Sequence, residues 1–212
     1  MLIHPRDAAD ETGWRPWLAA RDFGQLIATG RGRDLPVVVP THFAFDGEET
    51  VRLHLARPNP VWKALAENPN AVLALVDDHT YVPAGWGGTN VPTSHYAAVQ
   101  LVCTAVVLDA PAAKAVLLTR QLAHFEPPGG RASVSETDEA DRRQLPGIRG
   151  LELTVREVRA KLTFAGNKSA EVRVHIADRL AERAGPRDAA AREHVLNRPS
   201  AQWPGLTWGT TA

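Results

Sequence analysis

The stretch LHLARPNPVWKAL, residues 53–65, decides how we interpret the first half of this 212-residue chain. Its first part continues an alternation of apolar and polar residues, which is typical of a half-buried strand. Pro58 ends that strand, Asn59 suits the N-cap of a helix, and Pro60 suits its first turn. The sequence therefore predicts a strand-to-helix corner held by two prolines and an asparagine, with a histidine and an arginine on the strand side.

Strand-like segments surround this corner on both sides. They are Phe23–Thr29, Leu35–Asp46, Thr50–Ala56, Ala71–Val76, Tyr96–Asp109 and Leu151–Val155. Helices are predicted from Pro111 to about Phe125 and as a hairpin around Gly185-Pro186, and the polar segment Glu126–Gly147 is interpreted as a mobile connection or a lid. Strands in meander order with few helices among them favour a mainly β, α+β fold, an antiparallel barrel with peripheral helices.

Composition narrows the class of protein. Hydrophobic residues make up 44% of the chain, and no apolar run approaches the ~18 residues that a membrane span needs. Charges throughout Met1–Trp17 argue against a secretory signal, and a single cysteine suits a reducing cytoplasm. The net charge of zero provides no general attraction to nucleic acid or to anionic lipid. We therefore expect a cytoplasmic protein that binds neither DNA nor membranes.

Several strong chemical signatures are missing from the sequence. It has no Cys-x-x-Cys pair, no His-Glu-x-x-His helix, no Gly-x-Ser-x-Gly elbow and no dinucleotide-binding or P-loop spacing. Cys103 shares its strand face with apolar residues and is interpreted as a buried structural thiol. In the C-terminal hairpin, arginines and acidic residues balance one another, which is typical of a solvated helix face. No metal site is predicted.

Polar or cationic groups gather instead at three strand ends. These segments are HLARPNPVW (54–62), VPTSHYAAVQ (91–100) and AKLTFAGNKS (160–169). Arginine offers a planar fork for phosphate, and hydroxyls with exposed backbone N–H groups can complete a phosphate cup. Aromatic residues such as Tyr96 or Trp62 would suit the face of a flat ring. The pattern therefore predicts a site for an anionic, planar cofactor.

The same segments resemble the PaiB-like, FMN-binding split-barrel family, a group that includes negative transcriptional regulators. The similarity rests on LHLARPNPVWKAL, on YVPAGW (81–86), on VPTSHYAAVQLVCTAVVLD (91–109) and on IRGLELTVREVRAKLTFAGNKS (148–169). Their order and spacing agree from roughly Gly24 to Ser169. The resemblance implies a split β-barrel over residues 1–168, helices and a tail packed on it over 169–212, a homodimer, and FMN at the subunit interface.

The resemblance also assigns cofactor-binding positions. They are His54, Arg57, Asn59, Thr93, His95, Tyr96 and Lys161. From the residues alone, alternatives stay open: a backbone partner for His54, a structural ion pair for Arg57 or Lys161, and simple helix capping by Asn59. This chain departs from the family pattern at Ser94-His95 and Thr163-Phe164, which touch the expected ring pocket.

Three functions follow as hypotheses. The first is a dimeric flavin-dependent oxidoreductase that acts on a small molecule and in which the cofactor performs the redox step. The second is a haem-binding split-barrel enzyme similar to piperazate synthases, with His54 or His95 as the axial ligand. The third is a non-enzymatic regulator that responds to flavin or redox state. No catalytic side chain is assigned.

Overall fold

A computed structural model describes residues 1–197 of the chain. The chain divides into two compact units. One comprises Met1–Glu11, Val76–Ala98 and the chain from Ala160 onward, and we call it the terminal unit. The other comprises Thr12–Leu75 and Val99–Arg159, and we call it the central unit. The C-terminal tail, which the resemblance predicted to pack on the barrel, lies outside the described residues.

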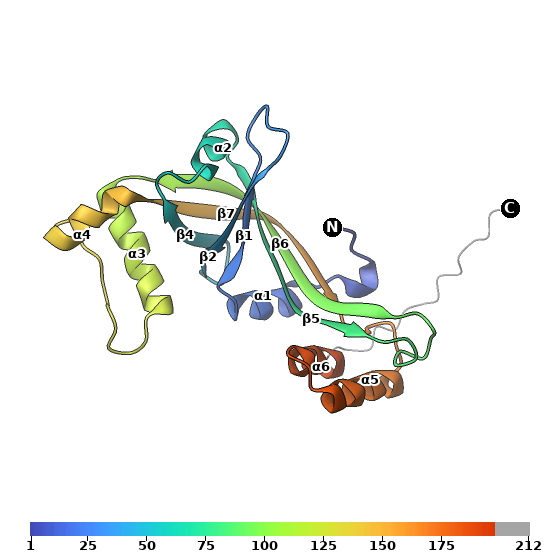
Figure 1. The fold of residues 1–212 in the computed structure, drawn as a ribbon. Coiled ribbons are helices and arrows are strands. Elements are labelled where there is room, and N and C mark those ends of the chain that lie inside the picture. The colour runs from blue at the N-terminus through green and yellow to red at the C-terminus, as the bar shows by residue number, and fades with distance from the viewer. Residues whose placement is uncertain (198–212) are drawn as a thin grey trace. The chain divides into compact units, whose positions relative to one another are not determined.

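The described chain contains seven strands and six α-helices (Figure 1). The strands are β1 (Phe23–Ala28), β2 (Val37–His42), β3 (Ala44–Phe45), β4 (Thr50–Ala56), β5 (Asn70–Val82), β6 (Thr93–Leu108) and β7 (Ile148–Thr163). The helices are α1 (Glu11–Ala19), α2 (Val61–Glu67), α3 (Pro111–Phe125), α4 (Glu139–Gln144), α5 (Ala170–Arg183) and α6 (Asp188–Asn197), with 3₁₀ turns η1 (Pro5–Asp7) and η2 (Leu145–Gly147).

All seven strands belong to one sheet, in the order β2-β1-β5-β6-β7-β4-β3. The pairs β1–β2, β1–β5, β3–β4 and β4–β7 are antiparallel. The order runs from one edge strand to another, so the sheet is not closed. This mixed architecture confirms the predicted α+β class.

Alternation along the strands explains which residues form the core. In β4, Val51, Leu53 and Leu55 are buried, whereas the residues between them are more exposed. In β6, Cys103 is buried as expected, and burial raises the pKa of its thiol to about 12. Such a thiol stays protonated at neutral pH and is chemically quiet. The predicted structural role of Cys103 is consistent with this environment.

Three local features differ from the sequence-based expectation. Helix α1 was missed because its sequence, ETGWRPWLA, contains Gly13 and Pro16, which both disfavour helix. Burial of Trp14 and Trp17 outweighs that preference. Strand β5 extends well past Val76, and the expected polar connection from Glu126 contains α4, whose N-cap is Asp138. Tertiary packing and capping therefore add structure where composition alone predicted loop.

Helix α3 packs against β4 in the central unit. Gly150 of β7, which pairs with His54 in the antiparallel register, permits this close approach. A Cβ atom at Gly150 would lie 3.0 Å from Cδ1 of Leu117 on α3, tighter than most carbon contacts. The missing side chain thus lets α3 lie over the strand that carries His54.

The predicted C-terminal hairpin is present as α5 and α6, which lie side by side in the terminal unit (Figure 1). Asp188 is buried at the start of α6 and accepts hydrogen bonds from the Gly185 N–H and the Thr80 hydroxyl, at 2.8 and 2.6 Å. Arg183 donates to the same carboxylate at 2.6 Å, and this bond holds the pKa of Asp188 well below its usual range. Arg183 and Asp188 thus form a local ion pair at the turn of the hairpin.

Candidate cofactor site

The central unit contains a cavity of about 750 Å³. Small-molecule sites in proteins typically measure roughly 300–1,000 Å³ and are mostly apolar. The apolar lining here includes Leu118 and Leu122 of α3 together with Leu145 and Ile148. Because the cavity has the size and character of a ligand site, we take it as the candidate site of the described chain.

His54 is the residue among the sequence-predicted positions that lines this cavity. Its Nδ1 lies 2.6 Å from Oε1 of Gln121, a hydrogen bond between β4 and α3. Gln121 is buried, with 5% of its surface exposed, whereas His54 is exposed. A buried amide oxygen needs its partner, because leaving it unsatisfied is costly. The pair therefore orients the imidazole ring at the cavity wall.

Aromatic rings line another part of the cavity. Phe23 and Phe125 both stand edge-to-face against the imidazole of His42, with ring centroids 4.9 and 5.2 Å apart respectively. Phe23 is 53% exposed and Phe125 is 37% exposed, so both rings remain accessible. Accessible aromatic faces and edges suit contact with a planar ligand.

The connection between α3 and β7 closes a further side of the cavity. Val134 and Arg131 line it, and both are tied to neighbouring elements. The Val134 N–H donates to the Thr119 hydroxyl at 3.0 Å, and Arg131 donates to the carboxylate of Asp141. Asp141 also accepts from the Ser135 N–H at 2.9 Å. The hydrogen bond from Arg131 holds the pKa of Asp141 below its usual range, so this wall is held by an ionised carboxylate.

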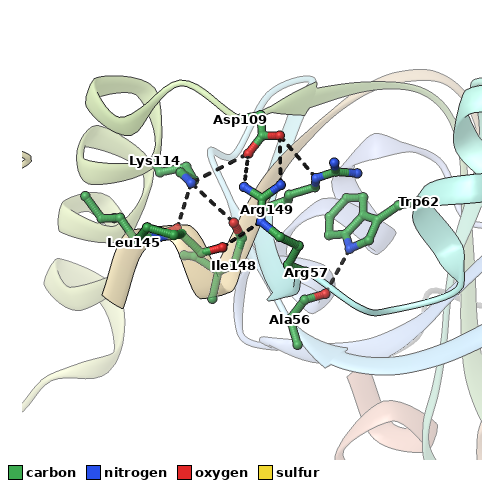
Figure 2. A network of polar contacts seen from close by, with 9 residues as sticks. Ala56, Arg57, Trp62, Asp109, Lys114, Leu145, Ile148 and Arg149 are labelled. Atoms are coloured by element: carbon green, nitrogen blue, oxygen red, sulfur yellow. Dashed lines mark hydrogen bonds and ion pairs between the residues drawn. The ribbon is translucent and has the colours of Figure 1, made fainter. Parts of the chain in front are cut away.

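A cationic cluster surrounds Asp109, as Figure 2 shows. Arg57 donates to this carboxylate at 2.5 Å, Arg149 lies 3.2 Å from it and Lys114 lies 3.6 Å from it. The hydrogen bond from Arg57 lowers the pKa of Asp109. Three cations around a single carboxylate leave an excess of positive charge.

Carbonyl groups connect the cluster to the cavity wall. Lys114 Nζ donates to the Leu145 carbonyl at 2.6 Å and to the Ile148 carbonyl at 3.3 Å, and both of those residues line the cavity (Figure 2). Arg57 itself donates through Nε to the Pro146 carbonyl at 2.6 Å and is not a lining residue. The arginine predicted as a phosphate ligand thus lies in an ion-pair network bordering the cavity.

The corner after β4 is a strand-to-helix junction as predicted, but α2 begins one residue later than expected, with Pro60 and not Asn59 at its N-cap. Oδ1 of Asn59 accepts the N–H of Val61, the first residue of α2, at 3.0 Å. Trp62 is buried and donates from Nε1 to the Ala56 carbonyl at 2.9 Å. The side chains of Asn59 and Trp62 therefore hold the corner on which Arg57 lies. Figure 2 shows Trp62 and Arg57 at this corner.

The remaining predicted positions belong to the terminal unit. Lys161 Nζ lies 5.2 Å from the ring centroid of Tyr96, a cation–π distance that brings two of these positions together. Thr93 is exposed at the first residue of β6.

His95 has a different environment from its neighbours on β6. It is 3% exposed, its Nδ1 has no hydrogen-bond partner within residues 1–197, and its ring stands edge-to-face on Phe164 at 5.8 Å. Burial lowers the pKa of His95 to about 4, so the imidazole is neutral at physiological pH.

Sequence reasoning missed most of the cavity lining. Gln121 lies 67 positions from His54, so no local spacing connects the two residues. His42 and Phe23 were assigned only to strands. A buried polar residue on an otherwise apolar helix face is the one signal that could have marked Gln121. In residues 1–197, no cluster of three or more His, Cys, Asp or Glu side chains is placed to hold a metal ion.

An open antiparallel sheet, flanking helices and a mostly apolar cavity of ligand size characterise this α+β protein. The sequence matches the family described as "Putative FMN-binding domain" over residues 1–157, and the chain belongs to that family. All residues that line the cavity lie within the matched range. The predicted relationship to FMN-binding split-barrel proteins is thereby confirmed.

Solved structures share the fold at low sequence identity. The FAD and haem binding protein from Mycobacterium smegmatis has a TM-score of 0.58 and 20% identity, over 82% of this chain and 80% of that one. A putative 5-nitroimidazole antibiotic resistance protein from Bacteroides thetaiotaomicron has a TM-score of 0.58 and 15% identity, over 73% and 85%. The flavocytochrome Anf3 from Azotobacter vinelandii has a TM-score of 0.53 and 16% identity, over 76% and 74%.

No curated protein is significantly similar to this chain in sequence. Within residues 1–197, no helix combines the length and apolar character that crossing a bilayer requires.

Proposed function

We propose that this protein binds a flavin, FMN in the first place, in the cavity of the central unit. One observation carries the proposal: an apolar cavity of about 750 Å³ with a hydrogen-bonded His54–Gln121 pair in its wall lies inside the family-matched residues. The apolar walls of α3 fit a flat ring, and the neighbouring cations fit a phosphate.

The cationic cluster supplies the charge that FMN requires. Arg57, Lys114 and Arg149 together carry more positive charge than Asp109 neutralises, and Arg57 and Arg149 are partly exposed. A phosphate would compete with Asp109 for guanidinium hydrogen bonds, which arginine makes in a planar fork. The cluster therefore serves as the phosphate end of the site.

When bound, a flavin would supply the redox chemistry, which is hydride or single-electron transfer. The chain itself orients the ring through His54 and the apolar wall, and it excludes water with the connection that contains Val134 and Arg131. We propose an oxidoreductase that acts on a small molecule, works as a homodimer as the family resemblance implies, and resides in the cytoplasm, where one cysteine suits reducing conditions.

A second cofactor, haem, is favoured by a specific feature of the same site. A histidine that ligates iron usually engages its other ring nitrogen with a carbonyl or carboxylate, and the Gln121 oxygen plays that part for His54. One fold neighbour is described as an FAD and haem binding protein, and another is described as a flavocytochrome. His95 is less suited, because its ring is buried against Phe164.

Absorbance and titration test the proposal. Purified protein should show flavin absorbance or should quench the fluorescence of added FMN on binding, whereas a Soret band would favour haem. Leu122→Trp, which places a larger ring in the cavity, should weaken FMN binding about tenfold or more. Val116→Trp is the matched control, because Val116 is exposed on the same helix and does not line the cavity. Equal FMN affinity for the two variants would exclude this cavity as the flavin site.

A further inference from the structure

Gln121 is the hydrogen-bond partner of Nδ1 in the His54 ring. Its amide oxygen is 2.6 Å from Nδ1, and an amide oxygen can only accept a hydrogen bond. A neutral imidazole has one N–H and one lone pair, so a proton on Nδ1 leaves the lone pair on Nε2. No residue of the described chain hydrogen-bonds that Nε2.

Besides His54 and Gln121, the polar side chains that line the cavity are those of Thr41, His42, Arg131, Asp141 and Gln144, and three of these five are engaged within the chain. The Thr41 hydroxyl donates to the His42 carbonyl at 3.0 Å, and Arg131 pairs with Asp141. The apolar side chains of α3 offer no hydrogen bonds. His54 is therefore placed to contribute an acceptor to a ligand in a largely apolar setting.

We propose that Gln121 is a positioning residue: it holds His54 as the Nδ1–H tautomer, so that Nε2 selects a planar ligand bearing a ring N–H donor. The ligand part rests on the proposed function, because oxidised flavin carries such a ring N–H at N3. The tautomer part depends only on the chain. A ligand that offers an acceptor at this position would meet a lone pair and bind less well.

The tautomer can be read directly from the full-length, ligand-free protein. Long-range ¹H–¹⁵N correlation spectra distinguish a protonated from an unprotonated ring nitrogen, and His54→Ala identifies the His54 signals by their loss. His194 provides an internal reference, because its Nε2 lies 2.8 Å from the Asp78 carboxylate and so carries the proton. We expect Nδ1–H for His54 and Nε2–H for His194 in one spectrum.

Two substitutions separate positioning from packing. Gln121→Met keeps a similar volume but removes the amide oxygen, so the His54 preference for Nδ1–H should be lost. Gln121→Glu keeps an acceptor and should restore a protonated Nδ1. A His54 signal with Nε2–H in the parent protein, or an unchanged signal in Gln121→Met, would overturn the assignment.

Ligand selection is tested with lumiflavin and 3-methyl-lumiflavin, which differ in the N3–H donor. We expect methylation to weaken binding about tenfold in the parent protein and about twofold or less in His54→Ala and Gln121→Met. If N3 methylation lowers the affinity equally in the parent and in His54→Ala, His54 does not select for the N3–H donor. If neither compound binds the parent, the flavin assignment fails together with the ligand part, whereas the spectrum decides the tautomer independently.

Discussion

The surroundings of His54 and of His95 show how similar strand-borne histidines acquire opposite properties. His54 is exposed at a cavity and hydrogen-bonded to Gln121. His95 is 3% exposed, has an unpaired Nδ1 among the described residues, and lies against Phe164. The group that packs on each strand makes the difference. His54 meets the buried amide of Gln121 on α3, whereas His95 meets the buried ring of Phe164. Whether a polar residue on a strand faces a ligand cavity or the core therefore depends on the element that packs over it.

The largest expected effect on stability concerns Phe164, the aromatic residue that packs against His95. Phe164 is 1% exposed and also stacks on His194 at a centroid distance of 4.4 Å. Phe164→Ala should reduce the free energy of unfolding by about 4 kcal/mol, because it leaves a cavity among buried rings. Urea denaturation measures this loss. Phe125→Ala, which truncates a partly exposed ring, should cost much less, and comparable losses for the two would contradict the contrast.

The ionisation of His95 should appear in the pH dependence of stability. Its folded pKa of about 4 lies below the unfolded value near 6.5, so the unfolded state binds the proton first as the pH falls. The stabilising contribution is complete above pH ~6.5 and is lost between about 6.5 and 4, by about 3 kcal/mol.

Replacement of His95 tests that pH window. His95→Leu removes the titrating group, so its unfolding free energy should fall less between pH 6.5 and 4.5 than that of the parent. Measurements at pH 7.5, where the parent histidine is neutral in both states, provide the control for packing changes. If the unfolding free energy depends on pH identically in the variant and the parent, His95 is not a buried neutral group.

The smallest effect is expected at the ion-pair cluster beside the open cavity. Arg57→Ala should lower stability only slightly, because the pair with Asp109 is partly exposed and screened by solvent. FMN affinity should fall about tenfold if the cluster holds the phosphate. Riboflavin, which lacks the phosphate, should bind variant and parent equally. An equal loss for both ligands would remove the cluster from the cofactor site.

The sequence predicted local structure best where chain chemistry acts over a few residues. The Pro-Asn-Pro corner, the alternation in β4, the helix beginning at Pro111 and the Gly185-Pro186 hairpin all occur where expected. Helix α1 was missed because burial of two tryptophans outweighs an internal glycine and proline. Local preferences are weak priors that tertiary packing can override.

The site was only partly predictable. His54 was recognised from its strand position, whereas Asn59 lies one residue before the N-cap of α2, which is Pro60, and accepts the Val61 N–H. Arg57 was identified as a phosphate ligand or an ion-pair partner, and the structure shows the ion pair with Asp109, 52 positions away. The cavity also includes Gln121, Phe23 and His42. They are brought together by contacts between segments that are far apart in the sequence, and such contacts cannot be deduced from residue spacing in one sequence.

By itself, the sequence determined the class of fold, the strand-to-helix corner and the burial of Cys103, because alternation, proline geometry and capping act between near neighbours. Only the tertiary structure decided that α3 lies on β4, that Gln121 orients His54, and that Phe164 buries His95. The physical reason is that hydrogen bonding and desolvation depend on the groups packed around a side chain. Those groups come from segments that are remote along the chain.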